Sequence, residues 1–208
     1  SIMRLLLGLA FLATASLASA QTFFGPSPYL KASDSPWFGM AGLVLEDAED
    51  GVFNIAGASS NHVAMSSSFG VDLIDSVDLD DGELNGVGNL GPLGPGEAFW
   101  SSDSITITFG VVGLPLPAYA GLVWTDGSGQ VTFEAFDGSG ASLGTITGNH
   151  ADGNFSSGTA EDRFYGVHYA GGIGSIRISN PGGIEIDHIQ IVPVPEPMTL
   201  TVLGLASV

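Results

Sequence analysis

Cysteine is absent from this chain, so no disulfide can support its fold. The same absence excludes thiol catalysis, zinc–thiolate sites and iron–sulfur clusters, because each of these needs a cysteine sulfur. The 208 residues are long enough for one domain with a real hydrophobic core. Stability must therefore come from that core, and a bound metal is the further support that the sequence leaves open.

Basic residues are nearly as scarce as cysteine. Lys and Arg total 4 against 22 Asp and Glu, which gives a net charge of −18. Such an acidic surface repels phosphate groups, so we expect no nucleic-acid partner. It attracts cations instead, and calcium is the natural candidate outside a cell because it prefers oxygen donors.

Sustained helical periodicity is missing after residue 20, whereas turn residues are abundant, with 31 Gly and 11 Pro. Apolar residues alternate with polar ones in three segments, 105–109, 131–136 and 176–179, which predicts half-buried strands. The short apolar runs 43–45 and 122–124 are typical of buried strands, and Asp126-Gly127 and Pro181-Gly182 of turns. We therefore expect an all-β fold, an antiparallel β-sandwich of which the jelly roll is one form.

The last predicted strand, residues 184–191, changes its alternation in the middle. Ile184 and Ile186 share one face, whereas Ile189 and Ile191 share the other. Either a bulge lies near residues 187–188 or the strand is covered on both faces. Both alternatives bring Glu185 or Asp187 close to buried surface.

The N-terminal segment has the pattern of a secretion signal. A short start with Arg4 precedes the apolar run 5–13, and Ala18-Ser19-Ala20 supplies small residues for cleavage. The apolar run is shorter than the ~20 residues that a transmembrane helix needs. We expect residues 1–20 to be a signal helix that is removed on export, followed by the body at 21–192.

The C-terminal segment combines a proline-rich stretch with a short apolar run. Val194, Pro195, Glu196 and Pro197 form a Val-Pro-Glu-Pro motif, and the chain resembles PEP-CTERM proteins at this point. The resemblance implies sorting by an exosortase to the cell surface or extracellular matrix of a Gram-negative bacterium. In that family one transmembrane helix and a basic cluster follow the motif. Residues 193–208 hold only the start of such an anchor, so we expect a truncated tag.

The body is similar to an uncharacterised sandwich domain that often precedes this tag. The resemblance implies fold and location, and it implies no established activity. The segments that carry it are 29–36, 45–51, 75–82, 121–127, 159–167 and 183–188.

Carboxylates cluster in the sequence, and dense acidic loops with glycine suit calcium, which takes about 6–8 oxygens. By analogy with calcium-bearing jelly-roll modules, an acidic first strand and an acidic last strand could share one ion, which would join Glu46 or Glu49 to Asp187. A second loop at 78–82 looks like part of a calcium site. Solvated acidic turns remain the alternative throughout. The predicted ligands are Glu46, Glu49, Asp50, Asp78, Asp80, Asp81 and Asp187.

Aromatic residues suggest a second kind of site. Trp37, Trp100, Trp124 and Tyr119 are candidates for a platform that stacks on sugar rings, with core packing as the alternative. Trp124 stands within an apolar run and is expected in the core. Trp37 and Trp100 lie in polar surroundings, so they are the predicted glycan-stacking residues.

No convincing catalytic set emerges from the sequence. The pattern Gly140-x-Ser142-x-Gly144 fits a nucleophile elbow, but a strand follows it where the elbow needs a helix. We therefore expect a non-enzymatic surface or matrix protein, associated with exopolysaccharide and stabilised by calcium. A secreted glycan-acting hydrolase that uses two carboxylates is the alternative, because sequence does not reveal the spacing of such a pair.

Overall fold

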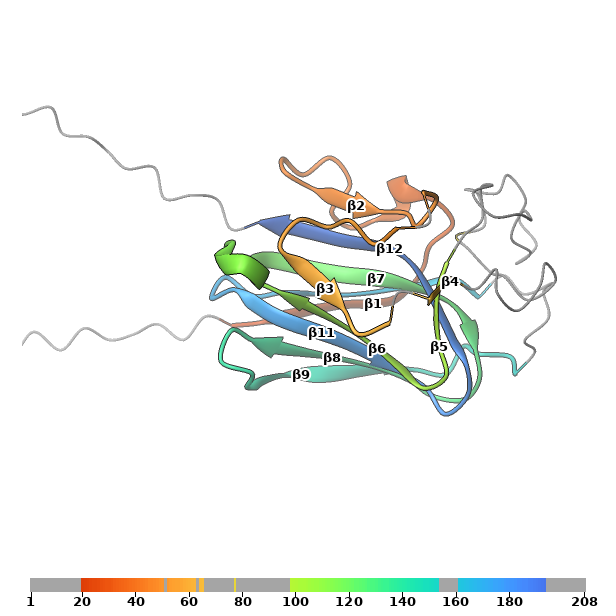
Figure 1. The fold of residues 1–208 in the computed structure, drawn as a ribbon. Coiled ribbons are helices and arrows are strands. Elements are labelled where there is room, and N and C mark those ends of the chain that lie inside the picture. The colour runs from red at the N-terminus through yellow and green to blue at the C-terminus, as the bar shows by residue number, and fades with distance from the viewer. Residues whose placement is uncertain are drawn as a thin grey trace, which may run out of the picture.

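The computed structural model describes residues 20–50, 52–62, 64–65, 77, 98–153 and 161–193, which form two antiparallel β-sheets in separate layers (Figure 1). Several predictions concern other parts of the chain. Residues 1–19 of the signal segment, the motif Val194-Pro195-Glu196-Pro197, and Asp78, Asp80 and Asp81 all lie outside the described residues.

One sheet has seven strands in the order β1-β10-β7-β12-β5-β4, with β2 paired to β12 beside that path. Its strands are β1 (Thr22–Pro28), β2 (Val44–Glu46), β4 (Ala64–Met65), β5 (Phe99–Ser101), β7 (Pro117–Gly127), β10 (Arg163–His168) and β12 (Ile184–Pro193). Residues 29–43, which include a short 3-10 helix at Ala32–Asp34, connect β1 to β2.

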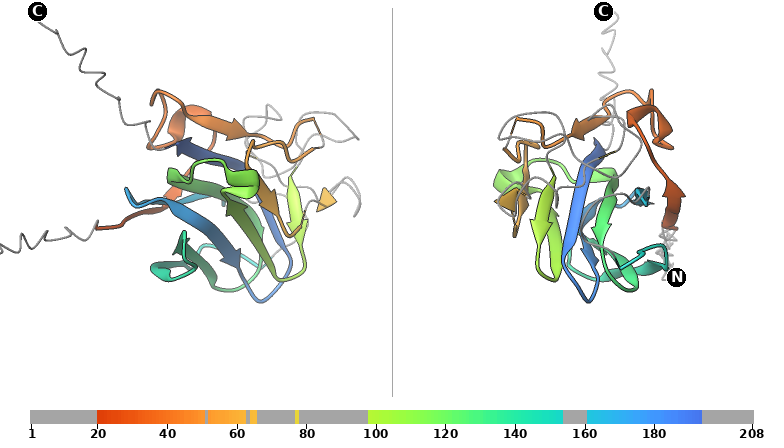
Figure 2. Two further views of the ribbon diagram at one scale, coloured as in Figure 1. Left: turned by 60° about the vertical axis from the view of Figure 1, so that its left-hand side comes forward. Right: turned by 90° about the vertical axis from the view of Figure 1, so that its right-hand side faces the viewer.

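The other sheet has five strands in the order β3-β6-β11-β8-β9. Its strands are β3 (Ala58–Ser60), β6 (Ser104–Phe109), β8 (Val131–Asp137), β9 (Ser142–Gly148) and β11 (Ile173–Ser179). A second 3-10 helix, Val111–Gly113, links β6 to β7. Figure 2 shows the two layers from two further sides.

The strand order identifies the sandwich as a jelly roll. Strands β5, β12, β7 and β10 are neighbours in one sheet, and β6, β11, β8 and β9 are neighbours in the other. Two interleaved Greek keys give this order. The predicted antiparallel β-sandwich is confirmed, and its jelly-roll form with it.

The main core lies between the sheets and follows the predicted alternation. Ile105, Ile107, Val131, Phe133, Ile176 and Ile178 of the five-stranded sheet are fully buried. Leu122 and Trp124 of β7 join the same cluster from the opposite sheet. The expectation that Trp124 belongs to the core is confirmed.

A second, aromatic cluster covers the outer face of the seven-stranded sheet, the face turned away from the five-stranded sheet. Val123 and Phe164 alternate with main-core residues along their strands, so they point outward. Residues 29–43 supply Tyr29 and Trp37 to cover them. The outer face is therefore buried here by a segment that lies between β1 and β2.

Two glycines make room for Trp37. Gly121 of β7 lies opposite Gly166 of β10. A Cβ atom on either glycine would come within 2.9 Å or 2.7 Å of the Trp37 indole, respectively. The indole therefore lies directly on the backbone of two neighbouring strands.

The last strand contains both features that its sequence left open. The register of β12 against β7 shifts between Asp187 and Gln190, and His188 has a positive φ of 42°. Residues 184–192 are also all buried, so β12 is covered on both faces. Glu185 is 5% exposed and Asp187 is 0% exposed, as expected for carboxylates near buried surface.

One predicted buried strand is an edge strand instead. Val44 and Leu45 of β2 are 39% and 37% exposed. β2 pairs with three residues at the end of β12, off the main path of the sheet, so little packs against it. Asp126-Gly127 likewise ends β7 rather than forming a turn.

Among the residues that the structure describes, no helix is long and apolar enough to cross a membrane.

Candidate functional site

Two of the acidic residues predicted to bind calcium, Glu46 and Asp50, accept hydrogen bonds from the loop that follows β2. Glu46 is 3% exposed, and its two carboxylate oxygens accept the main-chain N–H groups of Ala48 at 3.0 Å and Asn54 at 2.7 Å. Asp50 accepts the N–H of Val52 at 2.9 Å and the side-chain amide of Asn54 at 2.8 Å. Burial raises the pKa of Glu46 despite these two hydrogen bonds.

Asp187 accepts hydrogen bonds from other parts of the chain, namely from Val77 and from its neighbour His188. One of its carboxylate oxygens accepts the N–H of Val77 at 3.0 Å, and the other accepts the N–H of His188 at 2.6 Å. Within the described part of the chain, no three His, Cys, Asp or Glu side chains come together to hold a metal ion. The structure therefore does not join Glu46 or Glu49 to Asp187 in such a group.

The prediction that Trp37 stacks on a glycan is wrong. Trp37 is 1% exposed, so it presents no ring face to a ligand. Polar residues precede it in the sequence, but the glycine pair that receives its ring lies far along the chain. Trp100 in β5 is half-buried and lies opposite Glu185 of β12, and its role in glycan binding stays a prediction.

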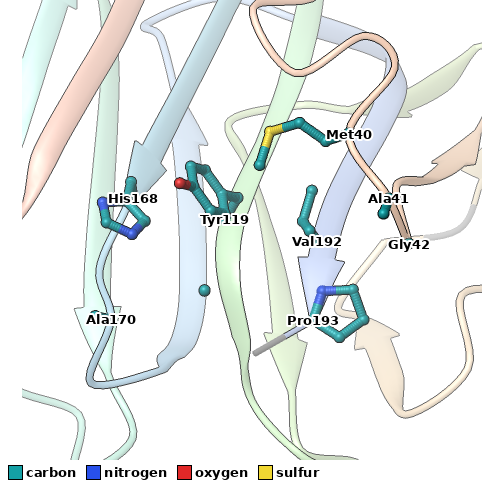
Figure 3. Close-up of a pocket in the computed structure, with 9 residues that line it drawn as sticks. Met40, Ala41, Gly42, Tyr119, His168, Ala170, Val192 and Pro193 are labelled. Atoms are coloured by element: carbon teal, nitrogen blue, oxygen red, sulfur yellow. The ribbon is translucent and has the colours of Figure 1, made fainter. Parts of the chain in front are cut away.

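An open pocket of about 630 Å³ lies on the outer face, at the end of the sheet where β7 begins. The register aligns one residue from each of four neighbouring strands here, namely Thr22, His168, Tyr119 and Val192. The described residues that line the pocket are Met40, Ala41, Gly42, Ala118, Tyr119, His168, Ala170, Val192 and Pro193 (Figure 3).

Tyr119 and His168 form the aromatic part of this pocket. Their rings stack with centroids 4.3 Å apart and planes inclined by 29°. Figure 3 shows Tyr119 in the middle of the site, between His168 on one side and Met40 and Val192 on the other. Trp37 meets Tyr119 edge-on, with ring centroids 5.6 Å apart. The buried tryptophan therefore supports the pocket from behind.

A pair of buried carboxylates lies at the opposite end of the same sheet. Asp126 and Glu161 are both 5% exposed. Burial is the main cause that raises the pKa of Asp126 to about 6 and that of Glu161 to about 8. The nearby Asp152 raises both values further by charge repulsion.

His150, two residues before Asp152, is held as a neutral ring. Its Nε2 is 2.5 Å from the Tyr165 hydroxyl. Its ring meets that of Trp124 edge-on, with the two ring centroids 4.8 Å apart. Burial, assisted by the charge of Arg163, lowers the pKa of His150 to about 4. The folded protein therefore keeps His150 neutral at pH values where the same ring in the unfolded chain already carries a proton.

We expect His150 to reduce stability in mild acid. Its folded pKa of about 4 lies below the ordinary 6.5, so stability is lost as the pH falls from 6.5 toward 4. Allowing for partial exposure, the loss is roughly 1–2 kcal/mol. Urea unfolding of wild type and His150→Gln at about pH 7.5 and pH 4.5 measures it. Equal acid-induced losses in both proteins would contradict this role.

Sequence reasoning missed the pocket because strand pairing assembles it. Tyr119 was noted among the aromatic residues, but its partner His168 carried no signal of its own. The sequence places Asp126 in a predicted turn, and Glu161 stands in segment 159–167 with no site assigned to it. Only the pairing of β7 with β10 brings each of these couples together.

Comparisons with known proteins leave the function open. No family model and no curated protein matches the chain. The K3 cleaved adhesin domain of Lys-gingipain from Porphyromonas gingivalis W83 is 14% identical, with a TM-score of 0.36 over 72% of this chain and 98% of that chain. The enzymatically active domain of tailspike protein 4 of bacteriophage CBA120 is 13% identical, with a TM-score of 0.31 over 81% of this chain and 22% of that chain. Likenesses this distant assign no activity to the chain.

Proposed function

We propose that this protein is a non-catalytic, exported surface or matrix module that binds saccharide units of an exopolysaccharide in the pocket at Tyr119 and His168. The observation that carries the proposal is the stacked aromatic pair inside an open pocket. Its volume of about 630 Å³ falls within the range of about 300–1,000 Å³ that is typical of small-molecule sites.

The chemistry of the lining suits a sugar ring. The C–H face of a pyranose is apolar and packs against aromatic and aliphatic side chains, which Tyr119, Met40 and Val192 supply. The Tyr119 hydroxyl and the His168 ring nitrogens are the polar groups available to sugar hydroxyls. A few polar groups within an apolar lining are the usual composition of a selective small-molecule site.

A hydrolase that uses paired carboxylates is less well supported. The described residues that line the pocket include no Asp or Glu. The buried pair Asp126 and Glu161 lies near the other end of β7. At about 3.3 Å per strand residue, that end is on the order of 20 Å from Tyr119. A glycosidase must combine a saccharide pocket with a pair of carboxylates, and here the pocket and the carboxylate pair are far apart.

Export and sorting rest on the two ends of the sequence. The signal pattern before residue 20 supports transfer across the inner membrane, and Val194-Pro195-Glu196-Pro197 supports recognition by an exosortase. Sorting by an exosortase would place the body at the cell surface or in the matrix. Location and pocket together lead to the proposal of exopolysaccharide as the ligand.

Tyr119→Ala is expected to weaken saccharide binding about tenfold, because it removes one ring of the stacked pair. A glycan array with the purified protein, followed by calorimetry on the best ligand, measures the loss. Phe38→Ala is the matched control, since Phe38 is 62% exposed and does not line the pocket. Absence of any glycan binding, or equal binding by Tyr119→Ala and wild type, would refute the proposed site.

A further inference from the structure

Two buried carboxylates meet where β7 ends and β10 begins. Arg163 pairs with Trp124 across these antiparallel strands. Continuing that register by two residues places Glu161 opposite Asp126. Both residues are 5% exposed, and their carboxyl groups lie within hydrogen-bonding reach of each other.

One oxygen of this pair is unsatisfied. Glu161 Oε2 accepts the N–H of Asp152 at 2.8 Å, whereas the buried Oε1 has no hydrogen-bond partner. Ionised carboxylates have only acceptor atoms, so Asp126 cannot donate to Oε1 without a proton. Asp152 adds a third negative charge that repels both groups. The charge of Arg163 offsets this repulsion at Glu161 only in part, because the pKa of Glu161 remains raised.

The protein itself offers little positive charge for this position. Lys and Arg total 4 in the whole chain. Arg163 is the basic residue adjacent in sequence, but its Nη1 donates to the main-chain oxygen of Asp162 at 2.8 Å. Buried carboxylates without a cationic or hydrogen-bonding partner are strongly unfavourable. A proton shared between the two carboxyl groups relieves the repulsion only in part, whereas a cation from solvent would neutralise both groups.

We propose that Asp126 and Glu161 together bind a divalent cation, and that this cation is calcium. The side chains supply only oxygen donors, which suit calcium better than zinc or copper. Calcium tolerates irregular geometry and takes about 6–8 ligands, of which water and main-chain carbonyls commonly provide several. Two carboxylates therefore suffice as the charged part of its shell. The site is independent of the saccharide pocket.

Thermal unfolding of the full chain with EDTA or with about 10 mM CaCl₂ tests the site. For a weak extracellular site that is nearly saturated, we expect the Tm to rise by about 5–10 °C in calcium. The same concentration of MgCl₂ is expected to give a smaller rise, because Mg²⁺ demands strict octahedral geometry. An unchanged Tm in calcium would overturn the proposal.

Two substitutions locate the ion. Glu161→Gln and Asp126→Asn should each abolish the calcium-induced shift. In EDTA each variant should unfold at a Tm equal to or above that of wild type, because a repelling buried charge is gone. This second readout distinguishes loss of the site from loss of the fold.

Two further variants serve as controls. Glu134→Gln makes the same chemical change on β8 of the other sheet, where Glu134 accepts a hydrogen bond from Ser142, and it should keep the full calcium shift. Asp80→Asn tests the acidic loop predicted from the sequence. A calcium shift that survives in Glu161→Gln but disappears in Asp80→Asn would place the ion in that loop and overturn the assignment to Asp126 and Glu161.

Discussion

Replacing Trp37 with alanine is expected to lower the free energy of unfolding by about 3–5 kcal/mol. Trp37 is 1% exposed and lies on the backbone of Gly121 and Gly166. Its ring meets Phe164 edge-on with centroids 5.0 Å apart, and Tyr119 at 5.6 Å. The substitution leaves a cavity that residues 29–43 cannot fill without moving.

Urea unfolding followed by circular dichroism measures the Trp37→Ala loss. Phe38→Ala, the neighbouring aromatic residue at 62% exposure, is expected to change stability by less than about 0.5 kcal/mol. Because Trp37 supports Tyr119, the variant should also bind saccharide more weakly than wild type at a temperature where it is folded. Equal, small effects of the two substitutions would contradict the packing of Trp37 on the glycines.

Replacing Trp124 with alanine is expected to lower the free energy of unfolding by a similar amount, about 3–5 kcal/mol. Trp124 is 0% exposed within the core between the sheets, and its Nε1 donates to Asn180 Oδ1 at 3.3 Å. Truncation removes a large buried side chain and also a hydrogen-bond donor to a buried amide.

Trp100→Ala is the comparison for Trp124→Ala, because Trp100 is half-buried on the short strand β5. We expect its effect on the free energy of unfolding to be at most half that of Trp124→Ala, since less of its surface is buried. Chemical denaturation of both variants gives the two values. A larger loss for Trp100 than for Trp124 would contradict the assignment of the main core.

Local sequence patterns predicted the strands well. The alternation at residues 105–109, 131–136 and 176–179 marks side chains that point alternately inward and outward, and this depends only on neighbours in sequence. The changed alternation after Ile186 predicted either a bulge or a strand covered on both faces, and β12 has both features. The jelly-roll order itself depends on pairings between distant segments, so the sequence left it as one form among sandwiches.

The same distinction explains the errors about single residues. Trp37 has polar neighbours in sequence and was expected to be accessible, but residues of β7 and β10 form the slot that buries it. Val44 and Leu45 were expected to be buried because they are apolar, but their strand lies at the edge of the sheet. Burial here depends on tertiary position, which a run of three residues does not specify.

The candidate sites show this limit most clearly. One antiparallel pairing, of β7 with β10, brings two residue pairs together. These pairs are Tyr119 with His168 and Asp126 with Glu161. Composition did indicate cation binding, because an acidic chain has few basic residues to pair with any carboxylate that becomes buried. It did not indicate which carboxylates are buried together.

The central claim is that the pocket at Tyr119 and His168 binds saccharide. A titration of ¹⁵N-labelled protein with exopolysaccharide oligosaccharides, followed by amide chemical shifts, tests it most directly. We expect saturable shifts that concentrate at residues 40–42, 118–119, 168–170 and 192, around the pocket. Shifts centred on Trp100 and β5, or no shifts at saturating ligand, would contradict it.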